Sequence, residues 1–222
     1  MLVLCEMKNM KTKEIFALAI QNHLKNNLQI AENLYKEVLK SNPNHFGSIF
    51  YLGTLLVQTE RFELAKPLLH KATQINPNYA AAHNNLGAAL KELGEYQGTI
   101  NCCQKAIQIN PNYADAHNNL GAALKELDEY QKAIGCYEKA IQIQPNHVDA
   151  HNNLGIILQE LDRVNEAKKY FEKSLNLDPN NKKACKGYGN ILFKLNQHSK
   201  ALAYIGKGSG FIRFTQKDVK II

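Results

Sequence analysis

Five of the six prolines in this chain are spaced at a fixed interval of 34 residues, and Pro67 lies off that register. The residues that keep this interval each precede an asparagine, and they are Pro43, Pro77, Pro111, Pro145 and Pro179. The repetition extends to whole segments, since residues 80–113 and 114–147 differ at nine positions only. Self-similarity with a period of roughly 20–50 residues is typical of proteins in which each unit packs on its neighbours. We therefore expect an array of similar units rather than one globule.

Each window also repeats small residues at fixed places. Four windows carry leucine followed by glycine at the same offset: Leu52-Gly53, Leu86-Gly87, Leu120-Gly121 and Leu154-Gly155. Glycine inside a helix costs about 1 kcal/mol relative to alanine, so its recurrence indicates a packing requirement, the close approach of a second helix. On that second helix the small residues are Ala31, Ala65, Ala133, Ala167 and Ala201, with Thr99 as the exception.

Each window is predicted to hold two helices. In residues 114–127, the apolar Ala116, Leu120 and Leu124 follow the three-to-four-residue spacing of one helix face. A second helix is expected to end near Ile143, because the proline that follows disfavours a helical conformation in the residue before it. The turn between the helices holds residues that tolerate a left-handed backbone, namely Asn26, Gly94, Asp128, Asp162 and Asn196, and Glu60 departs from this rule.

The combination of Leu-Gly, alanine, an aromatic residue and proline at fixed positions resembles the tetratricopeptide-repeat family. The resemblance implies an all-α fold, a right-handed α-solenoid of stacked antiparallel helical hairpins, the tetratricopeptide-repeat superhelix. Its expected parts are an N-terminal extension (1–11), five repeats (12–45, 46–79, 80–113, 114–147 and 148–181), a degenerate sixth repeat or capping helices (182–215) and a C-terminal tail (216–222). The last window lacks the proline and is expected to break at Gly206, Gly208 and Gly210.

The charge distribution, the length of the apolar runs and the cysteine spacing indicate where the protein is located and whether its thiols are reduced. The net charge of +7 comes from residues 182–222, which carry nine basic residues and one acid, while residues 1–181 are nearly neutral. No apolar run approaches the ~18 residues of a membrane span, and the apolar start is too short for a signal sequence. We expect a cytoplasmic protein without a membrane partner.

The cysteines lack CxxC spacing, so reduced and mostly buried thiols are expected: Cys5, Cys102, Cys103, Cys136 and Cys185.

Asparagine pairs in the predicted first helices are the main candidates for ligand contact. In the family that the chain resembles, these helices line the concave surface. The motif His-Asn-Asn-Leu-Gly resembles repeats of the O-linked N-acetylglucosamine transferase superhelix, where an asparagine ladder grips peptides. The resemblance implies peptide binding first by Asn85, Asn119 and Asn153, and then by Asn84, Asn118, Asn152, Tyr51 and Asn190. The alternative is that the pairs are passive copies from recent duplication, although the diverged window 148–181 retains both asparagines.

We find no catalytic or metal-binding pattern, so we expect no enzyme activity and no cofactor. His83, His117 and His151 occupy the position where the family often has tryptophan. Helices packed about 8–10 Å apart bring at most two of these rings together, so packing is favoured over zinc binding. A carboxylate clamp, another use of the family's first helices, is not expected, since the matching positions lack cations and Asp115 would repel a carboxylate.

Three functions remain open from the sequence. The chain is predicted to be a scaffold that binds a protein or an extended peptide in its concave groove. Alternatively, it is the substrate-recruiting arm of a larger enzyme, glycosyltransferase-like or oxygenase-like, or it self-assembles through exposed terminal hairpins. The basic and apolar segment 206–222 either covers the last hairpin or leads into another domain. Nucleic acid is not an expected ligand, because lysines without an interleaved base-stacking geometry are weak evidence for such binding.

Overall fold

The computed structural model describes residues 12–209, 212–214 and 219–221, and these residues form twelve helices and two short strands. The helices are α2 (Thr12–Leu24), α3 (Leu28–Ser41), α4 (Phe46–Gln58), α5 (Phe62–Ile75), α6 (Ala80–Glu92), α7 (Tyr96–Ile109), α8 (Ala114–Glu126), α9 (Tyr130–Ile143), α10 (Val148–Glu160), α11 (Val164–Leu177), α12 (Lys182–Lys194) and α13 (His198–Ser209). The predicted fold of helical hairpins is confirmed. None of the described helices is long and apolar enough to cross a membrane.

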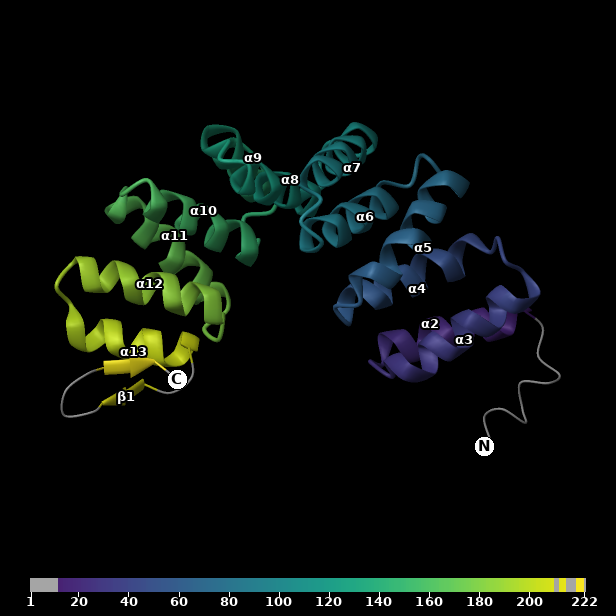
Figure 1. Ribbon diagram of the computed structural model, residues 1–222, viewed down its shortest axis with the longest axis horizontal. Coiled ribbons are helices and arrows are strands. Elements are labelled where there is room, and N and C mark those ends of the chain that lie inside the picture. The colour runs from purple at the N-terminus through teal and green to yellow at the C-terminus, as the bar shows by residue number, and fades with distance from the viewer. Residues whose placement is uncertain (1–11, 210–211, 215–218, 222) are drawn as a thin grey trace. The chain divides into compact units, whose positions relative to one another are not determined.

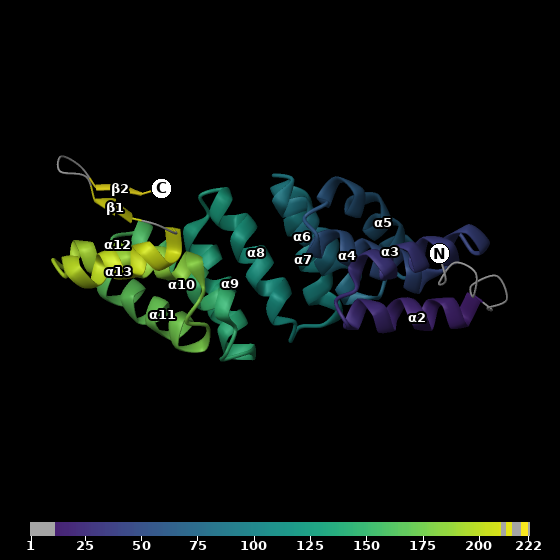
Figure 2. The ribbon, with the colours of Figure 1, turned by 90° about the horizontal axis from the view of Figure 1, so that it is seen from below.

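The chain divides into two compact units between Pro111 and Asn112. The first unit holds the hairpins α2–α3, α4–α5 and α6–α7, and its first helices contact one another, α2 with α4 and α4 with α6 (Figure 1). The second unit holds α8–α9, α10–α11 and α12–α13, and there α8 contacts α10 and α10 contacts α12 (Figure 2). Within each unit, therefore, the first helices form a continuous row.

The glycines of the Leu-Gly pairs lie where the two helices of a hairpin approach most closely. A β-carbon added at Gly121 would come within 2.8 Å of the Tyr137 ring, and one at Gly155 within 2.9 Å of the Phe171 ring. Tyr137 and Phe171 are themselves almost fully buried. The predicted packing requirement is confirmed, because a methyl group at either glycine would displace a large core side chain.

The small residues of the second helices complete this contact. The five alanines that recur at one offset are fully buried, and so is Thr99, which replaces alanine in α7. The Thr99 hydroxyl donates a hydrogen bond to the Gly87 carbonyl in α6 at 3.2 Å. The exception in the sequence therefore does not leave a buried polar group without a partner.

One residue with a left-handed backbone connects the two helices of each hairpin. The φ angles lie between 57° and 75° at Asn26, Glu60, Gly94, Asp128, Asp162 and Asn196. The prediction for the five favourable residues is confirmed, and Glu60 adopts the same conformation although its type does not favour it. At Glu60 the turn is closed by the Arg61 N–H, which donates to the Leu56 carbonyl at 2.8 Å. This bond is typical of a Schellman motif, which requires a left-handed residue.

Side chains cap several first helices at their N-termini. His45, His147 and Asn181 each accept a hydrogen bond from the backbone N–H three residues later, at 3.1, 3.2 and 2.9 Å. These bonds satisfy backbone donors that have no partner within the helix. The second ring nitrogen of His147, Nε2, lies 3.0 Å from Oδ1 of Asp115 in α8. One imidazole therefore caps α10 and ties it to α8.

Gly206 and Gly208, where the repeat pattern breaks, do not end the last helix. Helix α13 does not break at Gly206 or Gly208 but continues to Ser209, while Gly210 lies outside the described residues. A β-carbon at Gly208 would lie 2.7 Å from both the Lys182 carbonyl oxygen and the Lys186 nitrogen. The glycine thus permits close packing of α13 on α12, and this packing explains why the helix persists.

A short antiparallel ribbon follows α13. Strand β1 (Ile212–Phe214) pairs with β2 (Val219–Ile221), and β1 contacts α13 (Figure 1). In the register of the pair, the central residue Arg213 is opposite Lys220. These strands were not anticipated from the sequence. The N-terminal extension 1–11, which includes Cys5, lies outside the described residues.

Candidate functional site

The asparagine pairs of the second unit join neighbouring first helices. Asn118 in α8 and Asn152 in α10 are buried, whereas Asn119 and Asn153 are half-buried. Nδ2 of Asn153 donates to Oδ1 of Asn118 across the two helices at 3.0 Å. Oδ1 of Asn153 accepts from Nδ2 of Asn152 at 3.5 Å. The first asparagine of each pair is thus an internal group, and the second lies at the surface.

In the first unit, the acceptor for the surface asparagine comes from a different position of the repeat. Asn84 is buried, and its Nδ2 donates to Oδ1 of the half-buried Asn85 at 3.4 Å. Nδ2 of Asn85 in turn donates to Oγ1 of Thr54 in α4 at 2.9 Å. The Thr54 hydroxyl donates to the Phe50 carbonyl at 2.9 Å, so it is held by its own helix. The Thr54 hydroxyl accepts the kind of bond that the Asn118 oxygen accepts in the second unit, although the offset of Asn118 is occupied by Phe50 in this repeat.

These bonds leave part of the surface amides unused. A side-chain amide has two N–H donors and an oxygen with two lone pairs. Among the described residues, Asn85 and Asn153 each use one donor and one lone pair in the bonds given above. Each side chain is therefore oriented by its neighbours and still has one donor and one acceptor position for water or a ligand.

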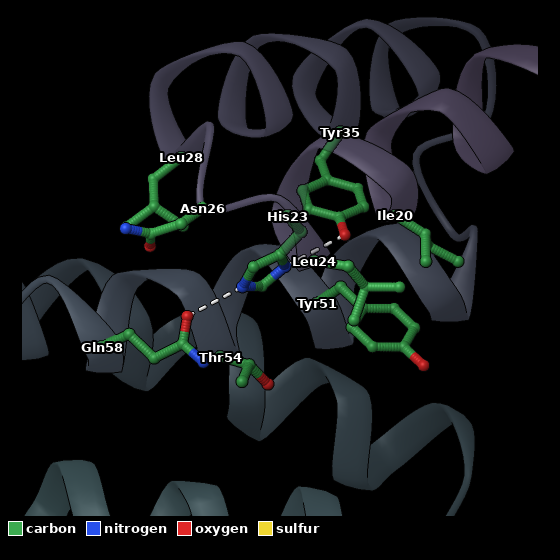
Figure 3. A pocket seen from close by; sticks show the side chains of 9 residues that line it. All are labelled: Ile20, His23, Leu24, Asn26, Leu28, Tyr35, Tyr51, Thr54 and Gln58. Atoms are coloured by element: carbon green, nitrogen blue, oxygen red, sulfur yellow. Dashed lines mark hydrogen bonds between the residues drawn. The ribbon is translucent and has the colours of Figure 1, made fainter.

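The remaining candidates from the sequence, Tyr51 and Asn190, are both half-buried on first helices, α4 and α12. Tyr51 borders a pocket of about 470 Å³ in the first unit. The pocket is formed by α2, α3, α4 and the turn between α2 and α3, and its nine lining side chains are labelled in Figure 3. Its volume lies within the range of roughly 300–1,000 Å³ that small-ligand pockets span.

A hydrogen-bonded histidine organises this pocket. His23 lies between Tyr35 and Gln58, with Nδ1 3.1 Å from the Tyr35 hydroxyl and Nε2 2.8 Å from Oε1 of Gln58 (Figure 3). Because the amide oxygen can only accept, Nε2 carries a proton, and in this tautomer Nδ1 is an acceptor for the Tyr35 hydroxyl. Burial raises the pKa of Tyr35, so its hydroxyl keeps the proton that it donates.

Aromatic contacts support the same side chains. The rings of Tyr35 and Tyr51 are stacked, with centroids 6.1 Å apart and planes 10° apart. Tyr51 also contacts Phe50 edge to face at 5.1 Å. Phe50 and Tyr51 occupy the offsets that Asn84 and Asn85 occupy one repeat later. The second repeat therefore has a buried and a half-buried aromatic ring at the offsets where the third, fourth and fifth repeats have amides.

The sequence-based prediction named Tyr51 but not His23, Leu24 or Gln58. A signal for them exists in the repeat register. The two offsets that hold His23-Leu24 and Val57-Gln58 in the first two repeats hold charged pairs later, Lys91-Glu92 and Lys125-Glu126. The first two repeats therefore differ from the third and fourth in having no lysine or glutamate at these two offsets.

Two of the recurring histidines contact the loops that precede their helices. Nε2 of His83 lies 2.9 Å from the Pro77 carbonyl oxygen, and Nε2 of His151 lies 2.9 Å from that of Pro145, so each ring anchors the preceding loop. Burial lowers the pKa of His151. The described residues contain no group of three or more histidine, cysteine, aspartate or glutamate side chains placed to hold a metal ion.

The four described cysteines have free thiols, of which Cys103 and Cys185 are buried and Cys102 and Cys136 half-buried. Burial raises the pKa of Cys102 and of Cys136 to about 11. Such thiols stay protonated at neutral pH and are poor nucleophiles. Their surroundings are those of core side chains.

Helical hairpins that repeat in the sequence and stack through small residues define the class of α-helical repeat proteins. The tetratricopeptide-repeat pattern matches residues 80–113 and, in a longer form, residues 112–180. The crystal structure of the MamA protein is 31% identical, and the match covers 76% of this chain and 92% of that chain with a TM-score of 0.64. The chain belongs to the tetratricopeptide-repeat family.

Two further solved structures extend the comparison. PilF of Pseudomonas aeruginosa is 28% identical, with 75% of this chain and 77% of that chain covered and a TM-score of 0.66. A chain of the Cut9–Hcn1 hetero-tetramer of APC/C is 14% identical, with 89% of this chain and 39% of that chain covered and a TM-score of 0.81, and it shares the fold alone. Comparison with curated protein sequences gives no significant match.

Proposed function

We propose that this chain is a scaffold that binds an extended segment of a partner protein along its first helices. The observation that carries the proposal is the pair of surface amides, Asn85 and Asn153, each oriented by neighbouring side chains and each with one donor and one acceptor position unused. Repeat arrays bind their partners along extended surfaces, and this chain belongs to a family of such arrays.

The chemistry of an amide suits a peptide backbone. Every peptide unit presents one N–H and one C=O, and a side-chain amide can pair with both. A group that is already fixed loses little conformational freedom on binding, so its hydrogen bonds contribute more to affinity than those of a mobile side chain. The bonds from Asn153 to Asn118 and from Asn85 to Thr54 supply that fixation.

The proposal is tested with an array of short, unrelated peptides. Wild type is expected to bind a subset of them, and the variant Asn85→Ala/Asn119→Ala/Asn153→Ala is expected to bind all of that subset more weakly. Asn165→Ala is the matched control, because Asn165 is an exposed asparagine on α11. Circular dichroism establishes that each variant is folded.

Backbone recognition is then tested with chemically altered peptides. Replacing single backbone N–H groups of a bound peptide by N-methyl groups is expected to weaken binding at specific positions. Equal binding by wild type and the triple variant, or binding unaffected by every N-methyl group, would overturn the role of the amides. Absence of any peptide binding by wild type would overturn the proposed function as a whole.

A further inference from the structure

We infer that the pocket between α2, α3 and α4 selects one uncharged, apolar side chain of the bound segment, while Gln58 donates a hydrogen bond to the backbone carbonyl of that residue. This inference rests on the proposed function and adds a sequence preference to it. The pocket would thus set where along the groove a ligand is placed, whereas the asparagine amides contact any sequence.

One apolar side chain of the pocket is largely exposed. The apolar lining residues are Ile20, Leu24 and Leu28, and of these Leu24 is 84% exposed while the other two are half-buried. Leu24 is the last residue of α2, so its side chain is not required for the contact between the helices of the hairpin. A ligand side chain that covers it would remove apolar surface from water, which favours binding.

Among the described residues, the lining of the pocket contains no lysine, arginine, aspartate or glutamate. Its polar members are the side chains of His23, Asn26, Thr54 and Gln58, together with the tyrosine hydroxyl groups. A lysine or aspartate side chain placed here would lose part of its hydration without gaining an opposite charge. The lining therefore selects against charged residues as well as for apolar ones.

Equivalent positions in later repeats have the opposite character. At the offsets of His23 and Leu24, the third repeat has Lys91 and Glu92, whose charged groups lie 2.9 Å apart. The fourth repeat has Lys125 and Glu126, with charged groups 3.2 Å apart. An apolar side chain would thus meet a favourable surface in the first two repeats and ion pairs at these offsets in the next two.

The hydrogen-bond chain through His23 orients the donor of the pocket. Oε1 of Gln58 accepts from Nε2 of His23, so the amide nitrogen of Gln58 must face away from the ring (Figure 3). Among the described residues, no hydrogen bond uses this Gln58 Nε2 group. Its two N–H groups are therefore available at the pocket, where a peptide carbonyl can accept one of them.

The experiment uses short peptides that differ only at one fixed position, occupied by Leu, Phe, Ser, Lys or Asp, and measures binding to the whole chain by fluorescence anisotropy. Wild type is expected to bind the Leu and Phe peptides roughly tenfold more tightly than the Lys and Asp peptides. Leu24→Lys is expected to abolish this preference, and so is Gln58→Glu, which retains the acceptor for His23 but removes the donors and adds a charge.

Leu64→Lys is the matched control, because Leu64 is a 59% exposed leucine of α5 outside the pocket. It is expected to keep the preference. Peptide binding without any preference at the fixed position, or a preference that survives both Leu24→Lys and Gln58→Glu, would overturn this inference and leave the proposed function standing. Binding of no peptide by wild type would overturn both.

Discussion

Arg61 holds both carboxylate oxygens of the buried Glu32, with its NH1 3.1 Å from Oε1 and its NH2 2.6 Å from Oε2. Glu32 is 4% exposed, and it lies on the second helix of the first repeat, while Arg61 precedes the second helix of the next. One repeat later, Lys66 and Glu95 form an ion pair with the same separation of 29 residues and the opposite order of charges. These pairs join successive hairpins at one place in the register.

Burial should decide what each pair contributes to stability. Arg61→Ala leaves a buried carboxylate with Lys36 as its remaining cation, and we expect the free energy of unfolding to fall by about 2 kcal/mol. Lys66→Ala is the matched control, because its pair is exposed, and a loss of about 0–1 kcal/mol is expected. Urea denaturation measures both. Equal losses would show that burial of Glu32 has no energetic consequence.

The same carboxylate should make stability depend on acid pH. The hydrogen bond from Arg61, with a smaller contribution from Lys36, holds the pKa of Glu32 below its ordinary value of 4.5. A lowered folded-state pKa means that the stabilisation is fully present above pH 4.5 and is lost as the pH falls through the folded-state value. Glu32→Gln should therefore be less stable than wild type at pH 7.

The difference between wild type and Glu32→Gln should shrink progressively below pH 4.5. Urea denaturation of both proteins over a pH series measures it. Because other titrating groups are common to the two proteins, the difference isolates this carboxylate. A difference that stays constant with pH would contradict the assignment.

The left-handed turn offers a reciprocal pair of substitutions. Glu60 has a φ angle of 57° although glutamate does not favour this conformation, so Glu60→Gly is expected to raise the free energy of unfolding by about 0.5–1 kcal/mol. Gly94 has a φ angle of 75° with open space around it, so Gly94→Glu is expected to lose a similar amount through backbone strain alone. Thermal denaturation of the two variants measures both changes. If both substitutions changed the stability in the same direction, backbone strain at the left-handed residue could not be the cause of both changes.

Two glycines in successive helices should respond oppositely to the same change. Gly121→Ala places a methyl group 2.8 Å from the buried Tyr137 ring, and a loss of about 1–3 kcal/mol is expected from overpacking. Gly135 lies within α9, where an added methyl group would meet open space, so Gly135→Ala should gain about 1 kcal/mol from helix propensity. Urea denaturation measures whether each substitution lowers or raises the free energy of unfolding. A tolerated Gly121→Ala would remove the packing explanation for the Leu-Gly pairs.

Features set by local sequence were predictable, and features set by neighbouring repeats were not. The role of Gly121 follows from a helix-breaking residue that recurs within a helix, and the turn at Asp128 follows from backbone preference. Glu60 has no such preference, so only the geometry imposed by its two helices reveals its conformation. Helix α13 likewise continues through Gly208 because α12 packs against it.

The same distinction holds for the candidate site. The asparagine pairs repeat, so the sequence points to them, but the burial of Asn118 and its bond to Asn153 depend on how α8 meets α10. The contact of His23 with Gln58 spans 35 residues and occurs in the first two repeats alone among the described ones. The repeat register marks these positions only by the absence of the charges that the third and fourth repeats carry there, and it does not show which side chains make contact.

The amide link between Asn118 and Asn153 can be measured as a coupling energy. Asn153→Ala removes the donor to the buried Asn118 oxygen, and Asn118→Ala removes the acceptor, so each should cost about 1 kcal/mol. The double variant should cost less than the sum by about 0.5–1.5 kcal/mol, because the second substitution has no bond left to break. Asn165→Ala on the exposed face of α11 should change stability by less than about 0.5 kcal/mol. Strict additivity in urea denaturation would show that the two amides do not interact, and the fixation of Asn153 that peptide binding requires would then have no basis.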